Sequence, residues 1–194
     1  MSGHSKWNNS KPVSYTHLSR RSIRDYKAQK VEREKLDNVI QAGRYTATAS
    51  NRQACTFILV QERLDQLKEV IWRDVEKAVG AGCPDAKPLE FLVRLRTEKG
   101  IDYLFRNAPA VLYVATENAW DAGLAAQNME LAAVSQGLGM LYNGYLVRST
   151  MLSVEAQEIL CLREKPVTAS MLLGYPNVRY IRTAPRKKPD VRWL

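Results

Sequence analysis

The chain of 194 residues carries a formal net charge of +9 and is 45% hydrophobic and 25% charged. This composition is typical of a single globular domain with a sizeable core, and it excludes disordered, collagen-like and disulfide-dependent proteins. The longest apolar run, Ala108 to Ala115, is far shorter than the about 20 residues of a membrane helix, and residues 1–17 lack a signal-peptide core, so we expect a cytoplasmic protein with no membrane partner.

Helices and one strand alternate in the first half of the chain. Apolar residues at three- and four-residue spacing, such as Leu36, Val39 and Ile40, predict a helix, whereas the apolar run from Phe57 to Val60 predicts a buried strand. In chain order we expect a helix over residues 31–45, a loop over 46–54, a strand over 57–60, a helix over 64–79 that Gly80 and Gly82 end, and a loop over 80–88.

The second half begins with residues 89–106, where apolar and basic positions recur at roughly helical spacing, and the assignment of this segment stays open. We then expect a strand over 110–115, a helix over 120–136, a helix over 153–162 that Ser153 caps, and a strand over 167–173. The helix over 120–136 is apolar around much of its circumference, which predicts burial on more than one side. No repeat or linker divides the chain, which favours one α+β or α/β domain.

The cysteines and histidines exclude several kinds of site. Three cysteines, Cys55, Cys83 and Cys161, have no metal-ligand spacing, and their odd number is typical of reduced thiols. The chain has two histidines, His4 and His17, and both lie near the polar N-terminus. They are too few to supply a multi-histidine metal site and give little support to a histidine-centred catalytic triad. We expect neither a metal nor a catalytic side chain of this kind.

Positive charge is concentrated at the two ends of the chain. Residues 1–35 hold nine Lys or Arg against three Asp or Glu, and residues 177–194 hold six against one, so the body between them is nearly neutral. Two basic ends are compatible with solvated tails, with a nucleic-acid footprint, or with two segments that converge on one anionic ligand. The run Arg20-Arg21-Ser22-Ile23-Arg24 favours the third interpretation, because its guanidinium groups and hydroxyl are donors that suit a phosphate monoester.

Five separated segments carry a resemblance to a known family. They are Arg20-Arg21-Ser22-Ile23-Arg24, Thr48-Ala49-Ser50-Asn51-Arg52-Gln53, Ala126-Gln127-Asn128-Met129 with Leu131-Ala132-Ala133, Gly137-Leu138-Gly139, and Leu173-Gly174-Tyr175-Pro176 followed by Arg186-Lys187-Lys188. In this order they resemble the FMN-dependent nitroreductase superfamily over residues 17–194. We expect residues 1–16 to be a disordered or expression-derived segment outside that domain.

The resemblance implies a fold and an assembly. The fold is α+β, a single FMN-binding domain with a mixed central sheet flanked by helices. The assembly is an intertwined homodimer, with FMN at the interface and the C-terminal arm exchanged onto the partner. The two basic ends would then lie near one phosphate, which accounts for the distribution of charge.

The resemblance also implies a set of cofactor-binding residues. They are Arg20, Arg21, Ser22, Arg24, Thr48, Ser50, Asn51, Gln53, Gly137, Leu138, Gly139, Arg186 and Lys188. The residues of the basic ends would hold the phosphate, with Arg24 nearer the pyrimidine edge. Those of the 48–53 loop would bond the ribityl chain and ring from either subunit, and the 137–139 turn would bring a backbone N–H to flavin N5. The competing interpretations are a solvated basic surface, an ordinary loop after a helix, and a glycine-terminated helix.

The function that the resemblance implies is ping-pong hydride transfer from NADH or NADPH, through flavin N5, to an electron-poor small-molecule acceptor such as a nitroaromatic or a quinone. The flavin carries the chemistry, so no catalytic residue is assigned, and Tyr142 and Tyr145 stay open as proton sources. Residues 80–108 would hold a lid. The alternatives are a dehalogenating or flavin-degrading enzyme of the same superfamily, and a basic nucleic-acid-binding protein that is no enzyme; we expect no nucleic-acid partner.

Overall fold

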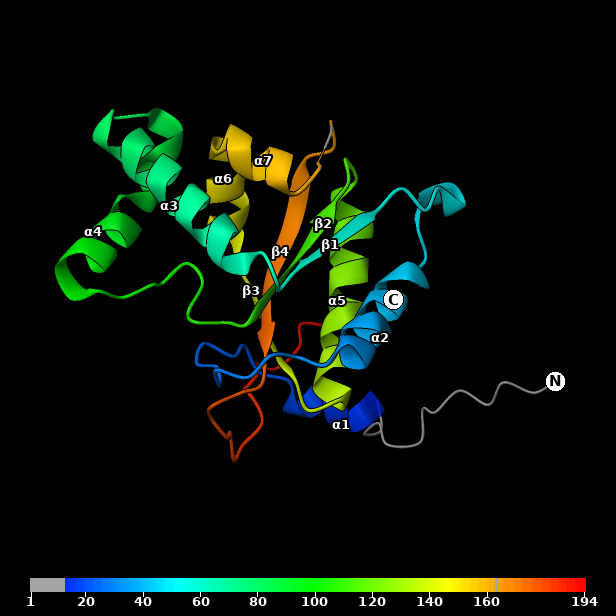
Figure 1. Cartoon of the computed structure of the whole chain (residues 1–194). Helices are drawn as coiled ribbons and strands as arrows, with labels where there is room; N and C mark the ends of the chain where they lie inside the picture. The colour runs from blue at the N-terminus through cyan, green and yellow to red at the C-terminus, as the bar shows by residue number, and fades with distance from the viewer. Residues whose placement is uncertain (1–12, 163) are drawn as a thin grey trace.

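A four-stranded sheet lies at the centre of the fold, which the computed structural model describes for residues 13–162 and 164–194 (Figure 1). Its strands are β1 (Thr56–Val60), β2 (Ala110–Ala115), β3 (Gly139–Tyr142) and β4 (Val167–Gly174), in the order β1-β2-β4-β3. Each neighbouring pair is antiparallel, and Tyr113 of β2 lies opposite Ile58 on one side and Ser170 on the other. The edge strands are therefore β1 and β3.

The expectation of a mixed sheet is wrong for the strands of one chain. The long connection after β1 returns the chain to the end of the sheet at which β1 finishes, so Val60 pairs with Val111 near the start of β2. The one parallel pairing in the described part of the chain is an isolated bridge between Ser22 and Met140. That bridge attaches the segment after the first helix to the other edge of β3, away from β4.

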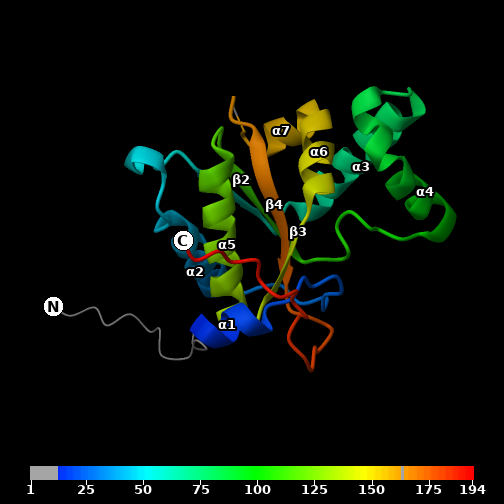
Figure 2. The same ribbon diagram turned by 180° about the vertical axis from the view of Figure 1, so that it is seen from behind.

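Three helices lie on one side of the sheet, as Figure 2 shows from behind. They are α1 (Val13–Ser19), α2 (Arg33–Arg44) and α5 (Ala119–Ser135). Because alternate strand residues point to opposite faces, Leu112 and Val114 of β2 belong to the same buried cluster as Val39 of α2 and Met129 of α5. The prediction that the helix over 120–136 is buried on more than one side is therefore confirmed for the sides that pack on α2 and on the sheet.

The opposite face is covered by a second group of helices (Figure 1). They are α3 (Leu64–Gly80), the 3-10 helix η2 (Pro84–Leu89), α4 (Glu90–Lys99), α6 (Gly144–Leu152) and α7 (Val154–Ile159). Val111 and Tyr113 of β2 point to this face and join a cluster that includes Ile71 and Leu146. The sheet thus has an apolar core on each side, as expected for a central β2 that is buried at every residue.

The predicted helices and strands are confirmed, and their ends differ from the predicted ones by at most three residues. Ser153 caps α7 as expected, because its hydroxyl accepts a hydrogen bond from the N–H of Ala156. The loop expected over 80–88 contains the short helix η2, and the unassigned segment contains α4, which ends at Gly100 with φ of +64°.

Two elements between residues 137 and 153 were not expected from the sequence, namely β3 and α6. The strand has only four residues, which is too short for an alternating pattern to stand out. The helix follows after a single residue, Asn143, whose side chain accepts a hydrogen bond from the N–H of Leu146 and caps the helix. Because this cap was not recognised in the sequence, the helix was not predicted either.

The N-terminal boundary also differs from the expected one. Residues 13–16, expected in the terminal segment, belong to α1, where Thr16 is buried and its carbonyl accepts a hydrogen bond from the N–H of Arg20. The expectation for residues 1–12 falls outside the described residues. Within the described part of the chain, no helix is long and apolar enough to cross a bilayer, and no group of three or more His, Cys, Asp or Glu side chains could hold a metal ion.

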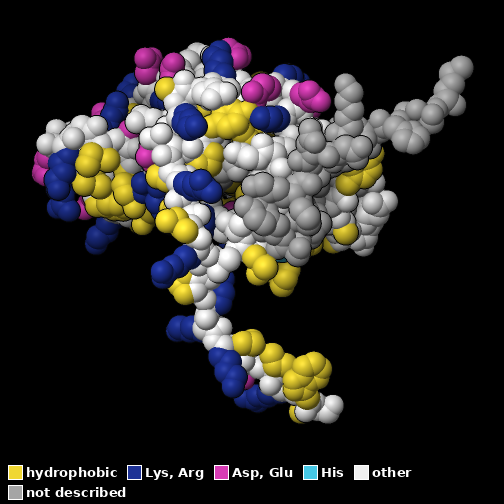
Figure 3. All heavy atoms as spheres, turned by 90° about the horizontal axis from the view of Figure 1, so that it is seen from below, with side chains coloured by type: hydrophobic (Ala, Val, Ile, Leu, Met, Phe, Trp, Pro, Cys, Tyr) yellow, Lys and Arg dark blue, Asp and Glu magenta, His cyan; other side chains and the backbone are white. Residues whose placement is uncertain are grey.

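The chain after β4 ends in an irregular segment, residues 178–194, which we call the C-terminal arm. Its root is fixed to the segment after α1, because the N–H of Lys27 donates to the Tyr175 carbonyl at 2.9 Å and the N–H of Asn177 to the Asp25 carbonyl at 3.0 Å. Beyond this root the arm leaves the body of the molecule, with basic and apolar side chains exposed along it (Figure 3).

Candidate functional site

The two basic ends of the chain meet at the edge of the sheet. The segment after α1 is anchored by Ile23, which is buried and whose N–H donates to the Met140 carbonyl of β3 at 3.0 Å. This anchor places the polar neighbours of Ile23 around a hollow of about 420 Å³, which we call the basic cradle. The cradle is lined by Arg20, Arg21, Ser22, Arg24, Tyr180, Ala184 and Arg186.

The guanidinium group of Arg20 is bound by a buried acid of α5. Its Nε donates to Oε2 of Glu130 at 2.8 Å, and the Glu130 side chain is 1% exposed, whereas that of Arg20 is 23% exposed. Because only Nε is used in this contact, the terminal N–H groups of Arg20 remain for a ligand in the cradle. Arg20 was predicted from the sequence, whereas Glu130 was not.

Arg21 ties the arm to the segment after α1. Its Nη2 donates to the carbonyl oxygen of Arg182, and its guanidinium lies 5.3 Å from the centre of the Tyr180 ring. This cation–π contact keeps the arm folded back along the cradle before it leaves the body. The contact of Arg21 with a bound phosphate stays a prediction.

The remaining cations of the cradle make only weak contacts with the described residues. Arg24 and Arg186 donate to carbonyls of nearby residues, Ser22 and Pro185, each at the long distance of 3.5 Å. Four guanidinium groups around one hollow repel each other, and the single acid beneath them, Glu130, offsets only part of that charge. The arrangement is therefore suited to an anion that accepts several hydrogen bonds, such as a phosphate.

The 48–53 loop lies at the far end of α2 and α5 from the cradle (Figure 1, cyan). The N–H of Ala49 donates to Oδ1 of Asp121 at 3.0 Å, in the first turn of α5. Asp121 precedes Glu130 by nine residues, which is about 13 Å along a helix. Within one chain the loop and the cradle therefore lie at opposite ends of α5.

The polar side chains of this loop are largely turned on one another. The hydroxyl of Thr48 accepts a hydrogen bond from the N–H of Gln53 at 2.9 Å, and the Gln53 amide donates to Asn51 at 3.1 Å. Ser50, Asn51 and Gln53 all have φ near +50°, a left-handed conformation that is uncommon for residues with a side chain. Backbone strain of this kind, at an exposed loop, is often found where a ligand or a partner binds.

The 137–139 turn ends α5 and supports the cradle from the side of β3. Gly137 has φ of +80°, and the N–H groups of Gly137 and Leu138 donate to carbonyls of the last turn of α5. At Gly139 a Cβ atom would lie 2.3 Å from Cγ1 of Ile23, so only glycine allows the anchor of the cradle to approach β3 this closely. These contacts account for the turn by packing, and its predicted contact with flavin N5 stays a prediction.

Lys188, the last of the predicted residues, is exposed on the arm and does not line the cradle. Its predicted contact with the phosphate therefore needs a movement of the arm beyond Arg186. The arm brings one predicted cation, Arg186, into the cradle and leaves the other outside.

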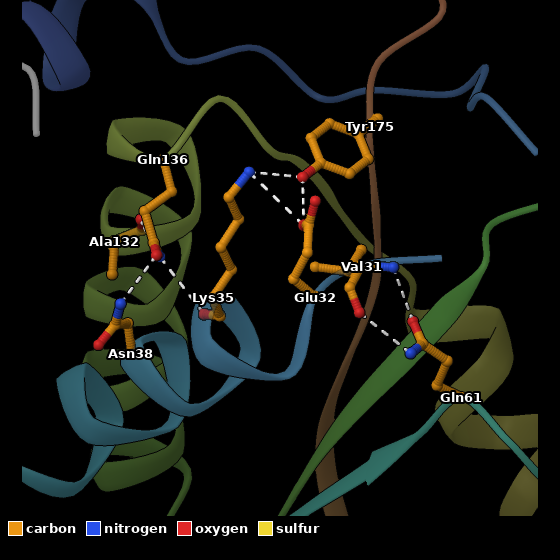
Figure 4. A network of polar contacts seen from close by, with 8 residues as sticks. All are labelled: Val31, Glu32, Lys35, Asn38, Gln61, Ala132, Gln136 and Tyr175. Atoms are coloured by element: carbon orange, nitrogen blue, oxygen red, sulfur yellow. Dashed lines mark hydrogen bonds and ion pairs between the residues drawn. The ribbon is translucent and has the colours of Figure 1, made fainter. Parts of the chain in front are cut away.

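A polar network at the root of the arm was not predicted from the sequence (Figure 4). Figure 4 shows Lys35, Glu32 and Tyr175 pointing toward one another: the Tyr175 hydroxyl donates to Glu32, and Lys35 donates to the Tyr175 hydroxyl and lies 3.5 Å from the Glu32 carboxylate. The hydrogen bond from Tyr175 lowers the pKa of Glu32, and the contact with Tyr175 raises that of Lys35. The network fixes the end of β4 to α2, directly before the arm begins.

Aromatic residues gather where β3 passes into α6. Phe91 of α4 meets Tyr145 of α6 edge to face at 5.2 Å, so the segment predicted to hold a lid packs beside the first turn of α6. Tyr142, at the end of β3, is 39% exposed, and its pKa is raised by partial loss of contact with water and, secondly, by the negative charge of Glu130. Tyr142 thus lies close to the cradle, whereas the lid itself stays a prediction.

The fold and the cradle together define a class of protein, an α+β domain with a basic hollow at the edge of its antiparallel sheet. The family model described as "Nitroreductase family" matches residues 18–175. The chain belongs to the nitroreductase family, and the resemblance drawn from its motifs is confirmed.

Two kinds of relative support this assignment. The chain is 34% identical over 174 residues to an NADPH-flavin oxidoreductase of Vibrio harveyi, a match that covers 84% of this chain and 65% of the relative, so it spans about two thirds of that protein's length. Among solved structures, a nitroreductase with bound FMN from Bacteroides fragilis has a TM-score of 0.77 at 19% identity, covering 95% of this chain and 100% of that one. A nitroreductase with bound FMN from Desulfitobacterium hafniense has a TM-score of 0.73 at 23% identity, covering 93% and 98%. At these identities the two structures show the shared fold.

Proposed function

We propose that the chain is an FMN-dependent oxidoreductase that takes reducing equivalents from NADH or NADPH and passes them to an electron-poor acceptor such as a nitroaromatic or a quinone. The observation that carries the proposal is the basic cradle, in which Arg186 from the end of the chain lies with Arg20, Arg21, Ser22 and Arg24 from its beginning. Membership of the nitroreductase family and the name of the Vibrio harveyi relative support the same chemistry.

The donors of the cradle fit the phosphate of FMN. A phosphate monoester is a dianion near neutral pH, and it accepts several charge-assisted hydrogen bonds from guanidinium and hydroxyl groups. Arg20, Ser22 and Arg186 would hold it, with Arg21 keeping the arm in place. When bound, FMN supplies the redox chemistry, accepting a hydride from the nicotinamide and passing it on by a ping-pong cycle.

Arg24 has a different task in this proposal. It lines the cradle, yet it is exposed and has no acid partner among the ion pairs of the described residues. A fixed cation beside the pyrimidine edge favours the reduced ring, which carries more negative charge than the oxidised ring. Arg24 would therefore raise the reduction potential and leave the affinity for the phosphate largely to its neighbours.

A homodimer completes the site in this proposal, in which the 48–53 loop, at the other end of α5 from its own cradle, serves the cradle of the partner. Two surfaces support it. The free edge of β1 borders an apolar groove of about 360 Å³, lined in part by Ile58, Leu59 and Leu160, which suits an added strand from the partner's arm. On α5, Trp120 is 82% and Leu124 is 50% exposed, one turn apart, as in a helix that packs against its twin.

Purification tests the proposal directly. We expect a yellow protein whose chromophore, released by heating, has the mass of FMN, and whose colour is bleached by NADH or NADPH without oxygen. A protein that stays colourless after reconstitution with FMN would contradict the proposal. Steeply salt-dependent binding of DNA by such a colourless protein would instead assign the basic ends to nucleic acid.

A further inference from the structure

Glu130 is a buried acid that has no part in the function proposed above. It lies between Met129 and Leu131 in an otherwise apolar stretch of α5, and the residue is fully buried. Its Oε2 accepts from Arg20 Nε at 2.8 Å and from the Gln127 amide at 3.4 Å, while its Oε1 is buried without a hydrogen-bond partner among the described residues.

Fold stability does not account for an acid at this position. A buried carboxylate oxygen without a donor is unfavourable, because it has lost its contacts with water and gained none. A buried ion pair is also often no more stabilising than apolar side chains of the same volume. A leucine or methionine would continue the apolar stretch of α5 and leave Arg20 free to turn to solvent.

The geometry of the contact indicates what the acid does. A guanidinium group has five N–H donors in one plane, and a contact at Nε fixes that plane while leaving the two terminal nitrogens unused. Glu130 lies in the interior behind Arg20, whereas Arg20 lines the cradle on its other side. The buried acid can thus hold the guanidinium from one edge while the other edge meets a ligand.

We propose that Glu130 is a positioning residue, which holds Arg20 through Nε so that the terminal N–H groups of Arg20 are presented to the phosphate of the bound ligand. The inference rests on the proposed function and adds to it a residue that never touches the ligand. What matters at position 130 is a hydrogen-bond acceptor fixed in the interior. A glutamine, which keeps an oxygen there, preserves the effect, and a leucine removes it.

The test compares FMN with riboflavin, which lacks only the phosphate. Dissociation constants for both are measured by quenching of flavin fluorescence, for the apoprotein of the wild type, Glu130→Gln and Glu130→Leu, and their ratio reports the phosphate contact alone. We expect Glu130→Leu to reduce the preference for FMN by about tenfold or more, with riboflavin affinity within about twofold of the wild type. Glu130→Gln keeps the preference at or above the wild-type value, because it retains the acceptor and removes a negative charge from beneath the cradle.

Two controls separate positioning from a general effect. Asp65→Asn changes an acid whose pair with Lys68 is exposed, at a side-chain exposure of 96%, and should leave both dissociation constants unchanged. In an Arg20→Met background, Glu130→Leu should change the preference no further, because the residue through which it acts is gone. Thermal unfolding of each variant verifies that it is folded, and Glu130→Met replaces Glu130→Leu if that variant is not.

Three results would overturn the inference. The first is an unchanged preference for FMN in Glu130→Leu. The second is an equal loss of FMN and riboflavin affinity, which is the sign of a merely structural role. The third is a loss of preference for FMN in Glu130→Gln that is as large as the loss in Glu130→Leu. If the wild type itself binds FMN and riboflavin equally well, the phosphate site fails, and the proposed function fails with it.

Discussion

Gly139 is required by a close contact between two segments of the protein. A Cβ atom there would lie 2.3 Å from Ile23 and 3.0 Å from Pro176, so the segment that carries the cradle would have to move away from β3. We expect Gly139→Ala to lower the free energy of unfolding by about 1–3 kcal/mol and to weaken FMN binding as well. Urea unfolding and flavin titration measure the two effects.

The matched control for this change is Gly80→Ala, at the end of α3, where a Cβ atom would meet nothing within 4 Å. That variant should be as stable as the wild type, or more stable by up to about 1 kcal/mol, because alanine favours the helix. If Gly139→Ala behaves like Gly80→Ala, then Ile23 adjusts without cost and the close approach does not determine the shape of the cradle.

Arg20 and Arg186 come from opposite ends of the chain and line the same hollow. If both contact one phosphate, each change to alanine should weaken FMN binding by about tenfold to a hundredfold, and the double variant should lose less than the product of the two effects. Isothermal titration of the four proteins measures this coupling. Independent effects on FMN, or equal effects on riboflavin, would show that the two arginines do not share a phosphate.

The arginines and the serine of the cradle could be predicted from the sequence because their side-chain types and their order along the chain carry the information, whereas Tyr180 and Ala184 could not. The run from Arg20 to Arg24 and the distant Arg186 are recognisable as phosphate donors from their side chains and their places along the chain. Glu130 gives only a weak signal, one acid between Met129 and Leu131 of α5, and nothing in its spacing indicates that Arg20 contacts it. Contacts between residues that are 110 positions apart depend on the fold, which a pattern along the chain does not contain.

At the level of elements, the network of Glu32, Lys35 and Tyr175 attaches α2 to the end of β4 and should make stability depend on pH. The lowered pKa of Glu32 means that its contribution is present above the usual value of 4.5 and is lost as the pH falls through the folded pKa. The raised pKa of Lys35 means that its contribution is present below the usual value of 10.5 and is lost as the pH rises through the folded pKa.

Tyr175→Phe removes the hydroxyl that is the largest cause of both shifts. We expect the difference in unfolding free energy between wild type and variant to be constant from about pH 6 to 9 and to shrink in stronger acid and stronger base. Urea unfolding across this range measures it, with Tyr180→Phe as a matched control on the arm. A difference that does not vary with pH would mean that the network contributes nothing through its charges.

The long helices and the central strands follow from periodicity, and their bounds were predicted within three residues. The elements around the site were harder to predict. β3 has four residues, its first is a glycine, and its role depends on Met140 pairing with the segment after α1. The arrangement of α4 could not be predicted because its apolar residues are spread around the helix and only Leu92 is buried.

For the molecule as a whole, the separation of the 48–53 loop from the cradle leads to a test of the proposed dimer. We expect a cradle variant, Arg20→Met, and a loop variant, Asn51→Ala with Gln53→Ala, each to bind FMN poorly. When the two are co-expressed in equal amounts, random pairing gives mixed dimers with one intact site, so about a quarter of all sites should regain FMN. The flavin content of the purified mixture measures this recovery.

Each variant co-expressed with itself is the control and should show no recovery. If the mixed preparation also shows none, the loop and the cradle do not meet across two chains. A wild-type mass in light scattering equal to one chain would have the same meaning. Either result would leave the 48–53 loop without a part in the site, and its strained backbone without an explanation.

The folding of the arm along the cradle has a consequence for proteolysis. Trypsin cleaves after Arg and Lys unless proline follows, and the arm offers it Arg179, Arg182, Arg186, Lys187 and Arg192. A phosphate that engages Arg186 should slow cleavage at that bond, while the bond after Arg192 stays open. The fraction of chains cleaved after Arg186, measured by mass spectrometry, would then report how much of the protein has bound cofactor. In a cell, a protein that has lost its flavin would be cleaved in the arm by proteases before any part of its core unfolds.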